Sequence, residues 1–379
     1  MAHAGMAAPG NVARVDAPSL AEVRAALPAD AFVIDEKRSL AYAMFSLVAT
    51  VAPAVLAYRY LPLSLVWLPV WVAVAIVVGT CAFGMWIIAH ECGHGAFSKH
   101  RAVETTVGFL FHTVLLVPYF SWQRSHAIHH AKTNHLTEGE SHVPVRADRG
   151  SGQLALRRHR TMGPRRYGWY NLVIHLLLGW PIYLLTGAVP SDGGGKTNHF
   201  WPWSPFNPRL FPRRMVGRVV ISALGVIAVI AALAWWTIVA GPAIVVALYV
   251  GPYLVTNAWL VVYTWLHHTN PDTPHLDGGQ WTFVDGAFCS IDRPYPQVVD
   301  VLHHRIGTTH AVHHLFSRIP HYRARSATAA ISEAYPGLYR YDPTPIHRAL
   351  WRVSRDCVAA TETASGWYYV DSDTAIDLR

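Results

Sequence analysis

Four long stretches of the sequence are almost entirely apolar, and they predict helices that cross a membrane. They cover residues 40–60, 64–88, 219–240 and 243–266. A helix needs about 20 apolar residues to cross the ~30 Å hydrocarbon core of a bilayer. Only residues 61–63 separate the first two stretches, and only Gly241 and Pro242 separate the second two. We therefore expect two tight helical hairpins.

Two further apolar stretches are not expected to cross. Residues 105–120 are few and include His112, so we expect them at the membrane interface or beneath other helices. Residues 167–188 are long enough to span. A fifth crossing would, however, place the last group of histidines across the membrane from the first two. This stretch also contains Pro181, His175 and Asn171, which suit an interfacial or re-entrant segment. We therefore predict that residues 167–188 do not cross the membrane.

Composition and charge agree with a membrane protein. Hydrophobic residues make up 52% of the chain and charged residues 14%, whereas about a quarter of the residues of a soluble protein are charged. The net charge is +8 without a lysine-rich tract or a nucleic-acid-reading module, so no nucleic acid is expected as a partner. Arginines concentrate between the hairpins, and the turns within the hairpins carry no Lys or Arg. The positive-inside rule therefore places this block and both termini in the cytoplasm.

These patterns predict an all-α, multi-pass integral membrane protein, with four transmembrane helices in two hairpins and a cytoplasmic helical cap. The expected parts follow in chain order: a cytoplasmic leader (1–38), the first hairpin (39–89), a cap segment with interfacial helices (90–218), the second hairpin (219–266), a second cap segment (267–340) and a C-terminal tail (341–379).

Eight histidines stand in three groups with helical spacing. The groups are His90 and His94; His126, His129 and His130; and His310, His313 and His314. Positions i, i+3 and i+4 of a helix share one face, so each group presents its imidazoles in one direction. A single histidine is usually an ordinary core or surface residue, which we expect of His112, His135, His142, His175 and His275. Three such groups beside a membrane instead predict a metal site on the cytoplasmic side.

The number of imidazoles bears on which metal is bound. Imidazole is a ligand of zinc, copper, iron and nickel, but one zinc ion takes only four ligands. Two six-coordinate iron ions with positions left open for dioxygen would use all of them. The sequence from His90 to His94 also fits the H-E-x-x-H pattern of zinc proteases, with Glu91 as general base. That alternative needs one further ligand and leaves most of the other histidines without a role.

The residues around these histidines resemble the three histidine boxes of membrane fatty acid desaturases. The similar segments are residues 88–98, 117–130 and 307–322, and the likeness runs from about residue 19 to about residue 330. It is closest to the Δ12/ω-3 acyl desaturases, a branch that includes hydroxylases and acetylenases. Gly95 follows the ω-3 pattern and Glu91 the Δ12 pattern, so the position of the double bond stays open.

The resemblance implies a set of metal ligands. Eight are the box histidines, and a ninth comes from the end of the fourth span, where His268 matches better than His267; His304 is a weaker candidate. The implied set is His90, His94, His126, His129, His130, His268, His310, His313 and His314. Carboxylates commonly orient ligating imidazoles, and the candidates are Glu91, Glu138, Asp285 and Asp292.

The resemblance also implies an activity. The chain would use two iron ions and dioxygen to insert a cis double bond into an acyl-CoA, acyl-carrier-protein or acyl-lipid substrate, with no catalytic residue beyond the metal centre. We expect no fused cytochrome b5-like domain, so electrons would come from a separate donor such as ferredoxin or cytochrome b5. A hydroxylase or acetylenase with the same boxes stays open. The arginines between residues 157 and 166 would either bind phosphates of the substrate or only set the topology.

Overall fold

The computed structural model describes residues 17–187, 196–206 and 210–377. The four predicted apolar stretches form long helices. The first hairpin consists of α2 (Glu36–Tyr60) and α3 (Leu68–His94), which follows the short turn η1 (Leu65–Trp67). The second consists of η3 (Arg213–Met215) and α8 (Val216–Ala240), followed by α9 (Pro242–Val245), the π-helical turn η4 (Val246–Val250) and α10 (Gly251–His268).

Two glycines end helices of the hairpins. Gly95 follows the last turn of α3 with φ +73°, and Gly241 joins α8 to α9 with φ +86°. A side chain disfavours this left-handed region, so glycine is the residue that ends a helix there at least cost. Gly95 therefore stops α3 directly after the histidine at position 94.

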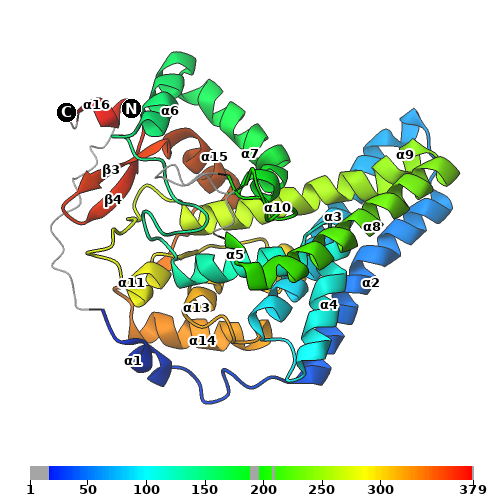
Figure 1. Cartoon of the computed structure of the whole chain (residues 1–379), viewed down its shortest axis with the longest axis horizontal. Coiled ribbons are helices and arrows are strands. Elements are labelled where there is room, and N and C mark those ends of the chain that lie inside the picture. Colours follow the sequence, from blue (N-terminus) through cyan, green and yellow to red (C-terminus); the bar gives the residue numbers. More distant parts are fainter. Residues whose placement is uncertain (1–16, 188–195, 207–209, 378–379) are drawn as a thin grey trace.

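Five helical segments of the described chain are long and apolar enough to span a membrane, one more than the four predicted. The fifth is α7 (Pro164–Thr186), which covers the stretch predicted not to cross. Figure 1 shows α2, α3, α8 and the start of α10 projecting to one side of the molecule, whereas α7 lies on the other side with α6 (Gly150–Met162) and α15 (Ile346–Asp356). Asn171 of α7 donates a hydrogen bond to the Ser354 carbonyl of α15 over 3.0 Å.

The stretch at 105–120 packs on other helices with one face and leaves Leu110 and Val114 exposed on the other. It falls on α4 (Arg101–Val114) and the start of α5 (Tyr119–Ala131), two helices that meet at 103°. Helix α4 packs against both α3 and α8. His112 is fully buried, and its ring lies against Trp86 and Trp122.

The rest of the cap is made of short elements. They are α1 (Leu20–Ala25), α11 (Phe283–Phe288), α12 (Gln297–Leu302), α13 (His310–Leu315), α14 (His321–Ala334), α16 (Thr374–Asp377) and two small sheets. β1 (Ile291–Asp292) pairs in parallel with β2 (Arg340–Tyr341), and β3 (Ala359–Thr363) pairs antiparallel with β4 (Gly366–Val370). The described part of the leader packs on α13 and α14 through Val23 and Ala31.

The segment after residue 341, expected as a polar tail, folds onto the cap. Helix α15 packs against α7 and α10. The strands β3 and β4 join the loops around Arg146 and His275 through isolated backbone bridges to Ala360 and Trp367. The side chain of Arg146 also stacks over the Trp367 ring at 4.3 Å. This segment is therefore part of the folded body that surrounds the histidines.

Candidate metal centre

The histidine boxes meet where α3, α5, α10 and α13 end or begin. His90 and His94 occupy the last turn of α3, and His268 ends α10. The second box lies on α5 and the third on α13. All nine histidines of the predicted ligand set come together at this point, in two adjoining groups.

The first group holds five imidazoles. Each offers one nitrogen, and these nitrogens all lie within 4.8 Å of one another. The Nε2 atoms of His90 and His94 are 3.3 Å apart, and those of His126 and His130 are 3.1 Å apart. The Nε2 atom of His313 is buried and has no hydrogen-bond partner in the described structure.

The second group holds four imidazoles. The ring nitrogens of His129, His268 and His314 lie within 4.8 Å of one another. The Nε2 atom of His310 is 3.0 Å from the Nε2 atoms of both His268 and His314. Nitrogens of five and of four imidazoles therefore converge on two neighbouring points.

These distances fit metal ions. Two nitrogens that bind one ion at about 2.1 Å and at right angles lie about 3.0 Å apart. The Nε2 separations in the structure are 3.0–3.3 Å. Burial, and then the neighbouring histidines, lower the pKa of His313 and of His314 well below the ordinary value. Both rings are therefore neutral at neutral pH, and the neutral ring is the form that binds a metal ion.

Hydroxyl groups orient two of the imidazoles. Thr133 Oγ1 lies 2.8 Å from Nδ1 of His314, and Ser141 Oγ lies 3.0 Å from Nδ1 of His129. A metal-bound imidazole carries its proton on the other ring nitrogen, so each Nδ1–H donates to the hydroxyl oxygen. Both contacts leave Nε2 directed into the second group.

A partly buried carboxyl group stands next to one of these hydroxyls. The hydroxyl of Tyr183 lies 2.8 Å from both carboxyl oxygens of Glu140, the residue before Ser141. Burial raises the pKa of Glu140 to about 8. The helical pattern of histidines in the sequence does not mark Glu140, Ser141 or Thr133, because all three stand outside it.

The four carboxylates expected to orient imidazoles have other contacts. Glu91 accepts hydrogen bonds from the backbone N–H and, over 2.6 Å, from Nδ1 of His321. Asp285 caps α11 with Thr282, and Glu138 pairs with Lys132 and His135. Asp292 accepts the backbone N–H of Ala311 over 2.9 Å. Of these four, Asp292 acts on a histidine box, through the backbone at the start of α13.

The position of Glu91 weakens the zinc-protease alternative. In a site of that kind, the carboxylate of the H-E-x-x-H motif must reach the metal-bound water. Both Glu91 oxygens are instead engaged by His321, outside the two groups of ring nitrogens. Glu91 therefore does not stand where that mechanism needs its general base.

The other two candidates for the ninth ligand, His267 and His304, are engaged in contacts outside the two groups. Both ring nitrogens of His267 are engaged, Nδ1 with the Ile291 carbonyl and Nε2 with the Tyr295 hydroxyl at 3.2 Å. His304 bonds to Ser46 over 2.8 Å, away from both groups. The structure thus brings His268, rather than His267 or His304, to the other eight.

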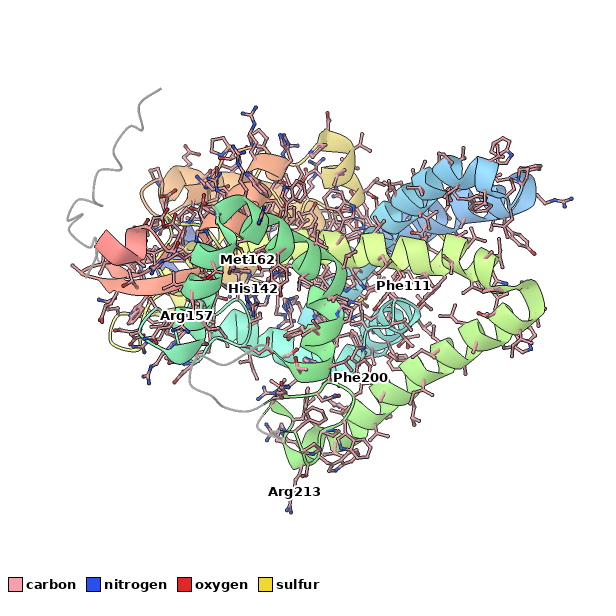
Figure 2. All side chains as sticks on the ribbon, turned by 90° about the horizontal axis from the view of Figure 1, so that it is seen from above. Phe111, His142, Arg157, Met162, Phe200 and Arg213 are labelled. Carbon is pink, nitrogen blue, oxygen red and sulfur yellow. The ribbon has the colours of Figure 1, made fainter. Side chains whose placement is uncertain are left out.

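Of the histidines expected to be ordinary, His142 lies closest to the centre. Its ring is 5.3 Å from the ring of His268, and Figure 2 shows it inside the molecule beside α6 and α7. His175 stacks on Trp265 at 4.4 Å, and His275 contacts the His142 carbonyl over 3.2 Å. His135 lies beside Glu138.

A mostly apolar cavity of about 460 Å³ adjoins the centre. Five ligand candidates from both groups form part of its wall, and Glu140 and Tyr183 lie beside them. Aromatic and aliphatic side chains form most of the remainder, among them Phe83, Trp86, Trp122, Trp180, Leu260 and Val261. The C-terminal segment closes one side with Cys357, Val358 and Tyr369. The chain can therefore hold a long apolar molecule against the two groups of nitrogens.

Comparison with known proteins agrees with this site. The sequence profile described as Fatty acid desaturase matches residues 65–345. The Delta(12) fatty acid desaturase of Mortierella isabellina is 39% identical over 299 residues, covering 76% of this chain and 74% of that protein. The Delta(12) fatty acid desaturase FAD2 of Calendula officinalis is 35% identical, covering 94% of this chain and 89% of that protein. The Delta(12)-fatty-acid desaturase of Arabidopsis thaliana is 33% identical, with 92% and 91% covered.

Proposed function

Because the chain belongs to the fatty acid desaturase family, we propose that it inserts a cis double bond at the Δ12 position of a fatty acyl chain. The observation that carries this proposal is the apolar cavity whose wall includes histidines of both groups. The position Δ12 rests on the names of the relatives. The substrate is an acyl chain on coenzyme A, on a carrier protein or in a lipid.

We assign one iron ion to each group of histidines. His90, His94, His126, His130 and His313 would hold the first ion, and His129, His268, His310 and His314 the second. Bound there, two iron ions would supply the reduction of dioxygen and the oxidising power that an unactivated C–H bond requires. The electrons come from a separate donor.

The side chains around the centre position the imidazoles and the acyl chain. Thr133 and Ser141 hold two imidazoles in the orientation that directs Nε2 inward. The aromatic wall formed by Trp86, Trp122 and Trp180 excludes water and keeps the acyl chain extended along the cavity. The depth to which the chain enters decides which methylene lies at the centre, and this selects the bond that is oxidised.

We further propose that four helical segments cross the membrane and that the centre faces the cytoplasm. Helix α7 packs against α15, which belongs to the cap, and against α10 near Trp265, close to the centre. With four crossings, all three boxes lie on one side. Arginines mark that side, among them Arg213, which projects outward at the start of α8 in Figure 2.

The test is to express the chain in a host that lacks the product and to identify its fatty acids by mass spectrometry. We expect a new Δ12 double bond, two iron ions per purified chain, and neither product nor full iron content in His313→Ala. A hydroxylated or acetylenic product would overturn the choice of reaction. One zinc ion per chain and no iron would overturn the di-iron proposal.

A further inference from the structure

A second pocket reaches the metal centre from another side. Its volume is about 670 Å³, and it lies among the end of α3, the starts of α4, α5 and α8, and the loop before α14. His94 forms part of its wall, and no residue is common to this pocket and the apolar cavity. Figure 1 shows the start of α4 on the opposite side of α5 and α10 from α7 and α15. The histidines therefore stand between the two spaces.

Four exposed cationic side chains line this second pocket: Lys99, Arg101, Arg218 and Arg318. Within the described residues, none of the four belongs to an ion pair. The one carboxylate in the lining, Glu104, accepts the backbone N–H groups of Phe97 and Ser98 at 3.3 and 3.2 Å. The four cations outnumber this one carboxylate, so the pocket presents a net positive field.

Another basic pocket differs from this one because carboxylates line it together with its arginines. Arg165, Arg166 and Arg355 line a space of about 590 Å³ near the start of α7, but Asp356 and Asp371 line it with them. Arg355 pairs with Asp356 over 2.6 Å. General positive-inside topology explains such a balanced cluster. It does not explain why four unpaired cations surround one pocket that reaches a metal-ligating histidine.

The four cations are not placed to bind the anionic group of the acyl substrate. The polar end of the substrate belongs at a mouth of the apolar cavity, since the acyl chain fills that cavity. An acyl chain anchored in the second pocket would have to pass through the histidines to enter the cavity, because the two spaces have no wall residue in common. A partner that exchanges electrons, in contrast, needs only a short distance to a ligand edge, and His94 is only partly buried there.

We propose that the pocket lined by Lys99, Arg101, Arg218 and Arg318 is the docking site of an acidic one-electron carrier protein, whose electrons enter the centre at His94. This proposal rests on the proposed desaturase function. The carrier gives two electrons, one at a time, and the acyl chain gives two electrons and two protons as its two C–H bonds become one C=C bond. Dioxygen accepts these four electrons and, with two protons from solvent, becomes two molecules of water.

The experiment compares two double variants of the iron-loaded enzyme in detergent. Arg101→Gln with Arg318→Gln removes two charges from the docking pocket, and Arg165→Gln with Arg166→Gln removes two from the balanced pocket. The probe is a reduced plant-type ferredoxin. We expect the first pair to weaken ferredoxin binding and raise its KM by about tenfold or more at low salt. The second pair should leave both values unchanged.

A chemical reductant separates docking from the reaction. With dithionite in place of ferredoxin, we expect the first pair to form as much product per iron as the unaltered enzyme. If the double variant Arg101→Gln with Arg318→Gln binds ferredoxin as tightly as the unaltered enzyme, the proposed docking site is wrong. A raised KM for the acyl substrate under dithionite would also overturn it and would assign the pocket to the substrate's anionic group. If the unaltered enzyme forms no double bond with dithionite, the proposed function fails, while the binding measurement still tests docking.

Discussion

At the scale of single residues, the orientation of His129 depends on a side chain that no helical pattern marks. Ser141 Oγ accepts the Nδ1–H of His129, and removing such a partner typically lowers metal affinity or activity 10- to 100-fold. We therefore expect Ser141→Ala to lose iron from the second group first, with iron content falling from two towards one per chain. Iron analysis of the purified protein measures this. Ser326→Ala, at an exposed serine of α14, is the matched control. Equal iron content in the two variants would show that Ser141 has no role in binding.

Glu140 provides a prediction about pH. Because burial raises its pKa to about 8, above the ordinary value of 4.5, the folded protein holds this proton more tightly than the unfolded chain does. The stability that this proton gives is fully present below about pH 4.5 and is lost as the pH rises through about 8. We expect Glu140→Gln to raise the thermal unfolding midpoint relative to the unaltered protein more at pH 8 than at pH 5. An equal difference at the two pH values would mean that the carboxyl is not held protonated.

At the scale of elements, the histidine spacing in the sequence was enough to place α3, α5 and α13, because each box repeats i, i+3 or i, i+4 on a buried helical face. The same rule could not find Ser141 or Glu140, which lie in the loop after α5 and reach the centre only through the tertiary fold. The strands β3 and β4 also escaped notice. Their short segments, such as Ala359–Thr363, lack the strict alternation of buried and exposed residues that indicates a strand.

The course of α7 can be tested by labelling from each side of the membrane. The four native cysteines are all buried, so they give little background. We expect a thiol at Lys196→Cys, after α7, to react with an impermeant maleimide from the cytoplasmic side only. Leu63→Cys, in the turn of the first hairpin, should react from the opposite side only. Reaction of both positions from the same side would show that α7 crosses the membrane.

At the scale of the whole molecule, the C-terminal segment forms part of the wall of the apolar cavity. Val358 is buried and lies in its wall. A larger side chain there should shorten the space, and one methylene in an apolar pocket changes discrimination by about 10-fold or more. We expect Val358→Phe to shift product formation towards shorter acyl chains by about tenfold, measured with a mixture of chain lengths. Val298→Phe, at an exposed position, is the control. An unchanged preference would place the end of the substrate elsewhere.

The distribution of the ligands along the chain also has a consequence for how the enzyme is made. Both groups of imidazoles include residues of α13, His313 in the first and His310 and His314 in the second. Neither of the two proposed iron ions could find its full set of ligands until the ribosome has synthesised the chain beyond both hairpins. The di-iron proposal therefore implies that iron loading is a late step of biogenesis, after membrane insertion. Cells short of iron should accumulate inserted chains with an open cap, which proteases degrade first.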